Sequence, residues 1–181
     1  MTACSEEPQV TQYKEDKPKE ETQATPDPME REASPDIARS AQVQTGEIGF
    51  EKPVAWSEGR SSSMRIASYS ADVGGDSADI SLVKLAGPAG GLLANVNRWR
   101  GQVGLGDFDA ASLASASESR KTTSGEDYIY VELVNPEGNQ AILGGIYERR
   151  GFTLFAKYSS TADSVAEGKA DFLTFCDSVK F

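Results

Sequence analysis

The sequence contains no histidine, and this absence removes several kinds of catalytic and metal site. Serine–histidine and cysteine–histidine nucleophile pairs, the commonest general base, and histidine-ligated zinc or iron all need that side chain. A paired-carboxylate hydrolase needs two acidic side chains on rigid strands that face one cleft. No expected strand offers an inward aspartate with such a partner. We therefore expect no catalytic residue and a protein that is not an enzyme; a carboxylate-dependent hydrolase that also uses Arg98 is the alternative.

Cysteines, basic residues and long apolar runs are also scarce. The two cysteines, Cys4 and Cys176, form neither a disulfide framework nor a CxxC pair. Lysine and arginine number 18 against 28 acidic residues, and the net charge of -10 argues against nucleic acid or an anionic lipid surface as the main partner. No segment approaches the roughly 20 apolar residues that a membrane-spanning helix needs. We expect no nucleic-acid partner and no cofactor.

Residues 1–46 have the composition of a disordered linker. From Ser5 to Gly46 there are ten acidic and five basic residues, five of the chain's eight prolines, and a single aromatic residue, Tyr13. Such a segment cannot bury enough apolar surface to offset the entropy lost on ordering. A flexible chain of this size has a mean end-to-end distance of roughly 35 Å, which suits a tether. We predict a disordered tail at 1–46 and one globular domain at 47–181.

Cys4 suggests what such a tether would be attached to. Thr2-Ala3-Cys4, followed by polar residues, resembles the end of a bacterial lipoprotein signal, in which the cysteine becomes lipid-modified. The apolar segment that precedes such a cysteine is missing, so either the precursor was trimmed or the native start lies upstream of Met1. We predict lipidation at Cys4 and attachment to a membrane through that lipid. The alternative is an incidental cysteine in a dispensable tail.

Residues 47–181 alternate between strand-like and helix-like patterns. Strands are expected at 48–56, 64–70 and 78–87, the third with apolar groups on both faces and therefore central in its sheet. A crossover helix and a short helix beginning near Asp109 follow. Three more strands, at 127–134, 140–150 and 151–159, are joined by tight turns. The order predicts an α+β fold, with a mainly antiparallel sheet of about six strands flanked by helices.

The closing helix is expected after Thr161. This residue is a suitable N-cap, with Asp163 in the first turn. One face of the helix collects apolar residues, namely Val165, Phe172, Cys176 and Val179. The pattern predicts a helix packed on the sheet, with Cys176 buried and unreactive.

The crossover helix lies within Gly87–Leu105 and has an apolar stripe and a polar edge. At about 100° per residue, Leu92, Val96, Trp99 and Val103 share one stripe. Trp99 and Trp56 are predicted to be core residues. Glycines stand before the first turn and after the last, where a positive φ is common at helix ends.

Asn95, Arg98 and Gln102 form the polar edge of this helix. A guanidinium between two amides is suited to bind a carboxylate, a carbonyl or a loop backbone. We predict that the three line a polar concavity in which an anionic or carbonyl-bearing group of a partner docks. In the alternative, they only fasten the helix to the neighbouring glycine-rich loop. The GPAGG segment does not have the spacing of a phosphate-binding loop.

Four acidic residues outside the tail, Asp107, Asp109, Glu126 and Asp127, are the only clusters in the domain suited to calcium or manganese. We interpret them as solvated turn charges and predict no metal site.

Several features together resemble one family. They are Pro53-x-x-Trp56 near the first strand, Arg65 in the second, a crossover helix ending in Trp99, a three-strand meander, and Ser178-x-x-Phe181 in the last helix. This layout over residues 48–181 is similar to the PsbP-like family, which includes extrinsic photosystem II proteins, DcrB-type bacterial lipoproteins and related Ran-binding import factors. The resemblance implies a PsbP-like α/β/α sandwich.

The resemblance and the tail together favour one function class. We expect a lipid-anchored accessory or binding module of the bacterial cell envelope, periplasmic or extracytoplasmic, that holds a protein partner or a small anionic ligand. A cytoplasmic GTPase-binding factor of the import-factor type is the second alternative, which acylation of Cys4 would exclude.

Overall fold

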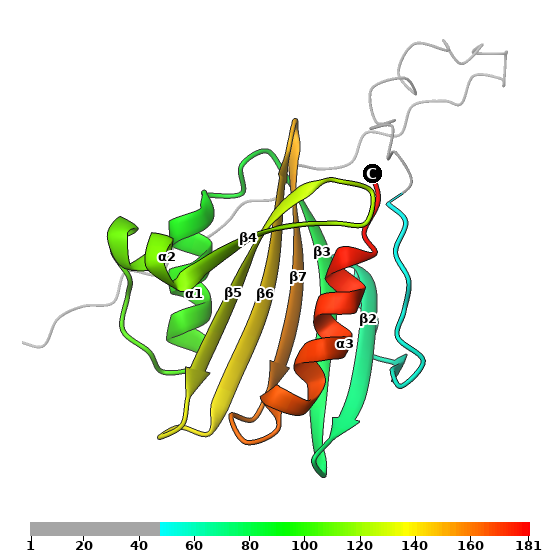
Figure 1. The fold of residues 1–181 in the computed structure, drawn as a ribbon, viewed down its shortest axis with the longest axis vertical. Coiled ribbons are helices and arrows are strands. Elements are labelled where there is room, and N and C mark those ends of the chain that lie inside the picture. The colour runs from blue at the N-terminus through cyan, green and yellow to red at the C-terminus, as the bar shows by residue number, and fades with distance from the viewer. Residues whose placement is uncertain (1–47) are drawn as a thin grey trace, which may run out of the picture. The chain divides into compact units, whose positions relative to one another are not determined.

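The fold is built on a sheet of seven antiparallel strands, in the order β1-β2-β3-β7-β6-β5-β4. The computed structural model describes residues 48–181 (Figure 1). In chain order the elements are β1 (Ser57–Glu58), β2 (Arg65–Val73), β3 (Asp76–Ala86), α1 (Leu92–Gln102), α2 (Ala110–Ala116), β4 (Ser117–Lys121), β5 (Asp127–Asn135), β6 (Gln140–Arg149), β7 (Phe152–Ser160) and α3 (Val165–Asp177). The predicted α+β class and antiparallel sheet are confirmed. The predictions for residues 1–46, including lipidation at Cys4, concern residues outside the described part of the chain.

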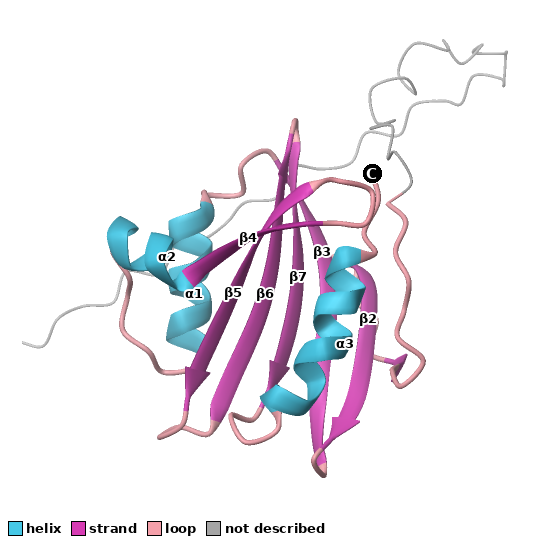
Figure 2. Ribbon diagram, in the orientation of Figure 1, coloured by secondary structure: helices cyan, strands magenta, loops and turns pink. Residues whose placement is uncertain are grey.

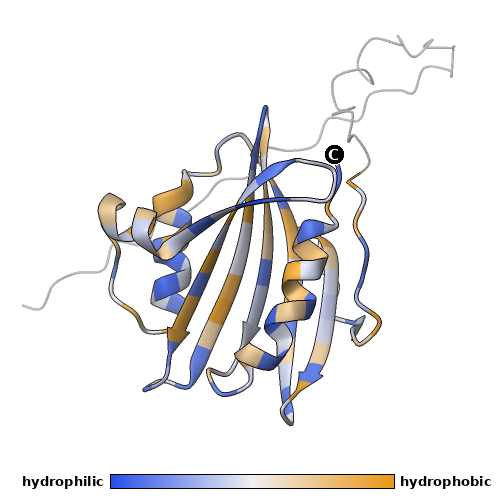
Figure 3. Cartoon of the chain, in the orientation of Figure 1, coloured by the Kyte–Doolittle hydropathy of each residue, from blue (hydrophilic) through white to orange (hydrophobic). Residues whose placement is uncertain are grey.

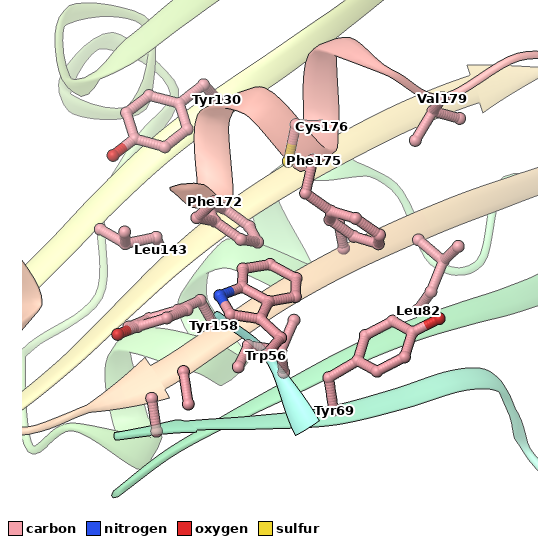
Figure 4. Close-up of a cluster of buried hydrophobic side chains, with 14 of the residues drawn as sticks. Trp56, Tyr69, Leu82, Tyr130, Leu143, Tyr158, Phe172, Phe175, Cys176 and Val179 are labelled. Carbon is pink, nitrogen blue, oxygen red and sulfur yellow. The ribbon is translucent and has the colours of Figure 1, made fainter. Parts of the chain in front are cut away.

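Helices cover both faces of the sheet. The larger core lies under α3, where Phe172, Phe175 and Cys176 are fully buried against the sheet (Figure 4). The smaller core lies under α1 and α2 and contains Val96 and Trp99. Figure 2 shows α3 in front of the sheet and the other two helices together beside β5. This is the arrangement expected from the apolar stripes of the two long helices.

Strand β6 is apolar on both faces because residues on its two faces belong to the two cores. Every residue of β6 from Ala141 to Tyr147 is buried, and orange apolar segments run along the middle of the sheet in Figure 3. Strand β3 pairs with β2 on one side and with β7 on the other, as its two-sided pattern predicts.

The predicted strand at 48–56 is wrong. This segment makes only an isolated bridge, Gly49 to Lys180, and then a turn in which the Trp56 amide donates to the Pro53 carbonyl at 3.1 Å. Proline has no amide hydrogen to contribute to a strand ladder. The first strand is instead the two-residue β1. Trp56 is buried against Phe175, with ring centroids 5.1 Å apart, so the core prediction for this residue is confirmed.

Strand β4 was not expected. Its sequence, SESRK, has no apolar alternation, and the strand forms the outer edge of the sheet beside β5. The start of α3 also differs from the prediction, because the regular helix has Ser164 as its N-cap and Asp163 precedes it. Thr161 still supports this end, since its hydroxyl accepts from the Ser164 amide at 3.3 Å. The four residues predicted to be buried on this helix are buried, but α3 ends at Asp177 and Val179 therefore lies just beyond it.

Gly144 allows α1 to approach the sheet. A Cβ atom at this position of β6 would lie 2.2 Å from Cζ3 of Trp99 and 3.0 Å from Cγ2 of Val131. Trp99 is 7% exposed and packs edge-on against Phe155, with ring centroids 5.9 Å apart. The indole therefore occupies the space that a side chain at position 144 would need, and the core prediction for Trp99 is confirmed.

Candidate functional site

Helix α1 begins and ends at glycines, as predicted. Gly90 and Gly91 have φ of 89° and 84° before its first turn, and Gly104 has φ of 75° after its last. Residues with side chains rarely adopt these values. The helix is thereby held between two loops, with Val96, Trp99 and Val103 toward the core.

Asn95 fastens the helix to the loop before it. The side chain is buried, and its amide nitrogen donates to the carbonyls of Ala89 and Gly91 at 2.9 and 2.7 Å. Its oxygen accepts from Nη1 of Arg98 at 2.7 Å. All of these bonds are internal to the protein. For Asn95 the geometry therefore favours the scaffold alternative.

Two further residues of α1 hold the loop that follows it. Asn97 exchanges a pair of hydrogen bonds with the backbone of Phe108, at 2.9 and 2.8 Å. Arg100 stacks over the Phe108 ring, with its guanidinium carbon 3.5 Å from the ring centroid. The sequence interpretation did not include these residues, although a polar helix edge beside a glycine-rich loop is the usual signal for such bonds.

Gln102 has a different partner from the other two predicted site residues. Arg98 and Asn95 contact each other, and Arg98 is exposed. Gln102, at the end of α1, reaches toward β7 instead, where its side-chain oxygen accepts from Nζ of Lys157 at 2.6 Å. Of the three predicted residues, Gln102 is the one that lines the hollow described next.

This hollow, here called the Lys157 hollow, has a volume of about 300 Å³ and lies between the end of α1 and strands β6 and β7. Its polar lining comes from Gln102, Gln140, Lys157, Ser159 and Ser160. The hydroxyl oxygen of Ser159 is buried and has no hydrogen-bond partner among residues 48–181. The hollow therefore holds one cation, two carboxamides and an unused hydroxyl.

Lys157 gives the hollow its charge. Burial lowers the pKa of this lysine, and the nearby Asp79 opposes that shift. Asp79 itself is held by Arg65 through two hydrogen bonds of 2.8 Å. In the described part of the chain, no carboxylate forms an ion pair with Lys157. A half-buried ammonium without a carboxylate partner is a group that an anion would stabilise.

Sequence reasoning missed Lys157 because the residue sits in a strand interpreted only as part of the meander. The sequence nevertheless contained a signal that marks this lysine. Lysine interrupts the run from Phe152 to Tyr158, in which residues of both faces are otherwise largely buried. A lysine in the middle of such a strand is uncommon unless it is paired or functional.

The polar cluster at the end of α3 is structural. Tyr128 donates to Asp177 at 2.5 Å, and Arg120 contacts both, which joins the end of α3 to β4 and β5. Burial raises the pKa of Cys176 to about 12, and its side chain is inaccessible. The predicted burial of this thiol is confirmed, and burial is the condition in which cysteines are unreactive.

The four acidic residues considered as metal ligands have other partners or lie apart. Asp109 caps α2 by accepting from the Ser112 amide at 2.7 Å. Asp127 pairs with Lys121, and Glu126 pairs with Arg149 at 3.2 Å. Within residues 48–181, no group of three or more acidic or cysteine side chains is placed to hold a metal ion. No helix in this region combines the length and apolar character needed to cross a membrane.

Comparison with known proteins gives structural matches only. No protein-family model and no curated protein matches the chain. Cyanobacterial PsbP (CyanoP) from Synechocystis sp. is 16% identical with a TM-score of 0.44, and the match covers 80% of this chain and 98% of CyanoP. LpqN of Mycobacterium tuberculosis, a protein involved in cell envelope biogenesis, is 14% identical with a TM-score of 0.40, over 74% of this chain and 83% of LpqN.

A third match is a protein of Bacteroides thetaiotaomicron, 13% identical with a TM-score of 0.40, over 74% of this chain and 44% of that one. CyanoP carries the name of the PsbP-like family that the sequence resembles. These similarities concern the fold, and no residue role, ligand or partner is taken from them.

Proposed function

We propose that this protein is a lipid-anchored accessory module of the bacterial cell envelope that binds an anionic or carbonyl-bearing group at the Lys157 hollow. The observation that carries the proposal is the half-buried Lys157, which has a carboxamide and an unused hydroxyl beside it and no carboxylate partner in the described region. An ammonium and amide hydrogens together bind a carboxylate more strongly than neutral donors alone.

The chemistry of the hollow favours binding over turnover. Its polar groups are an ammonium, two carboxamides and two hydroxyls, and none of them is a carboxylate that would serve as a general base. Gln102 provides the predicted link between α1 and the ligand. Arg98 lies one turn away on an exposed surface, where it would contact a larger partner and not the group inside the hollow.

The proposed anchoring rests on the sequence of the tail. Thr2-Ala3-Cys4 supplies the lipidation signal, and the acidic, proline-rich segment to residue 46 supplies the tether. A ligand site on a tethered domain can search the volume near a membrane without crossing it. This is the arrangement that an accessory module holding a protein partner or small ligand needs.

The test is a titration of the full chain, labelled with ¹⁵N, with succinate and with neutral succinamide as the control. We expect saturable amide shifts at Gln102, Lys157 and Ser159 with succinate only. Lys157→Met should weaken succinate binding at least tenfold. Lys84→Met is the matched control, because Lys84 is another half-buried strand lysine but lies over the Phe152 ring at 4.3 Å. Equal shifts with succinamide, or unchanged succinate binding in Lys157→Met, would overturn the proposal.

A further inference from the structure

A second hollow lies on the same sheet. It has a volume of about 490 Å³, is bounded by β1 and the residues that follow it, and is called the β1 hollow. Its lining includes Glu58, Arg60, Ser70, Ser77 and Asp79. In strand order the β1 hollow lies nearer the β1 edge of the sheet, whereas the Lys157 hollow lies farther along, at β7 and β6, which are the fourth and fifth strands.

The strand register joins the two hollows. Ser70 of β2 pairs with Asp79 of β3, Asp79 pairs with Ser159 of β7, and Ser159 pairs with Ile142 of β6. Directly paired residues of antiparallel strands project from the same face. The first two residues of this row line the β1 hollow and the last two line the Lys157 hollow. The two hollows are therefore the ends of one surface, about 14 Å long for three strand spacings, which we call the sheet groove.

Neither long helix covers the middle of the sheet groove. Helix α3 packs on the other face, against Tyr69, Ile80 and Leu82, whose side chains alternate with those of the groove. Helix α1 ends at Gln102, beside the Lys157 hollow. The side chain of Asp79, at the centre of the row, is 51% exposed. The sheet groove is thus open to solvent, with α1 as one wall and β1 as the other.

The polar groups along the sheet groove are hydroxyls, carboxamides and charged side chains. Ser70, Ser77 and Ser159 each offer a donor and an acceptor. The charge of Asp79 is met by Arg65. Among the described residues, Arg60 and Glu58 at the β1 end and Lys157 at the other end form no ion pair. The lining of the two hollows therefore holds two cations without an ion-pair partner in the described region, Arg60 and Lys157, against one such carboxylate, Glu58.

These features favour a polypeptide over a glycan. A peptide backbone presents alternating amide donors and carbonyl acceptors, which serine hydroxyls match, and an acidic side chain would match Lys157. Sugar rings are commonly bound on an exposed aromatic ring. The one aromatic residue in the lining of the two hollows is Tyr69, and its ring packs in the core against Trp56 and Phe175 on the other face.

We infer that the sheet groove binds an extended acidic peptide segment of a protein partner. The segment crosses β2, β3 and β7, and one carboxylate enters the Lys157 hollow. This inference rests on the proposed function and names the partner class for the same site.

The experiment presents the immobilised full chain with pooled acetylated octapeptides that carry one fixed glutamate among randomised positions, and identifies the retained peptides by mass spectrometry. Matched pools carry glutamine in place of glutamate, and maltohexaose and chitohexaose serve as glycan probes. Ser70→Tyr blocks the β1 end of the sheet groove, about 10 Å from β7 at two strand spacings. Ser119→Tyr is the matched control, since Ser119 is exposed on β4 at the other edge of the sheet.

We expect the glutamate pool to be retained at least tenfold over the glutamine pool. Ser70→Tyr should abolish this difference while succinate binding is unchanged, and Ser119→Tyr should change neither. Retention of a hexasaccharide in place of peptides, equal retention of the two pools, or retention unaffected by Ser70→Tyr would overturn the inference. If the wild-type chain binds succinate, any of these results overturns only the peptide inference and leaves the proposed function standing. If the wild-type chain does not bind succinate, the proposed function and the peptide inference are both overturned.

Discussion

The contact between Gly144 and Trp99 predicts a specific energetic coupling between α1 and the sheet. In Gly144→Ala the new methyl group would lie 2.2 Å from Cζ3 of Trp99 and 3.0 Å from Cγ2 of Val131. The indole is confined by Phe155 on its other side, so it has little room to move. Overpacking of this kind costs about 1 to 3 kcal/mol, and we expect about 2 to 3 kcal/mol here because the obstruction is a rigid ring.

The coupling is measured with a double-mutant cycle. Trp99→Ala alone should cost about 3 to 5 kcal/mol, since it empties a buried aromatic site. In that background Gly144→Ala should cost less than about 0.5 kcal/mol, because its methyl group then enters the cavity. The expected interaction energy is therefore about 2 kcal/mol, within the range for residues in contact.

The assay is urea unfolding followed by circular dichroism, which does not depend on the removed fluorophore. Gly101→Ala is the control within α1, because a methyl group at Gly101 meets nothing within 4 Å, and it should stabilise the protein by about 0.5 to 1 kcal/mol. If Gly144→Ala costs the same in both backgrounds, the close approach does not limit packing and the reasoning is refuted.

Three further predictions follow from the helix, the hollow and the tail. Asn95→Ala should lower the free energy of unfolding by about 2 to 3 kcal/mol, because it removes two side-chain hydrogen bonds to the loop and leaves the part-buried Ala89 carbonyl without its donor. Exposed Arg98→Ala should cost about 1 kcal/mol or less, and equal losses in urea unfolding would contradict this division. Succinate affinity should fall as pH rises, because only the charged form of Lys157 attracts the anion. Burial lowers the pKa of Lys157, so the midpoint should lie below the usual lysine pKa of about 10.4. A succinate affinity that stays constant up to a pH of about 10.4 would exclude a role for Lys157 in binding. Expressed with its full precursor, the protein should partition into the membrane fraction and Cys4→Ser should release it, so a soluble wild type would end the lipoprotein hypothesis.

Hydrophobic periodicity was sufficient for the interior of the fold. Strands β3, β5, β6 and β7 and the stripe of α1 bury apolar residues, and burial is what such periodicity encodes. The strands at the edges of the sheet could not be predicted from hydrophobic periodicity. Strand β4 is held by its backbone ladder to β5 and by the contact of Arg120 with Asp177, and neither leaves an apolar pattern in the sequence.

The candidate site was only partly predictable for a related reason. The polar edge of α1 was evident from its spacing, but spacing alone does not show that Asn95 turns into the loop while Gln102 turns to the sheet. The Lys157 hollow joins residues 55 positions apart in the chain. Such a site depends on strand order, and the sequence pattern does not specify which strand lies beside the end of α1.

The hydrogen bonds that join the two ends of the described domain affect the order in which the fold can form. Gly49 and Lys180 exchange two backbone hydrogen bonds of 3.1 and 2.8 Å, and the Glu51 amide donates to the Ser178 hydroxyl at 2.8 Å, across 127 positions of sequence. A ribosome releases residues 48–56 first and their partners on α3 and beyond last. Contacts of such separation also carry a large loop-closure cost and form late. During synthesis, the aromatic surface that Phe50 and Trp56 share with Phe175 therefore stays open until the final residues leave the tunnel, and a chain that stops before Ser178 cannot close it.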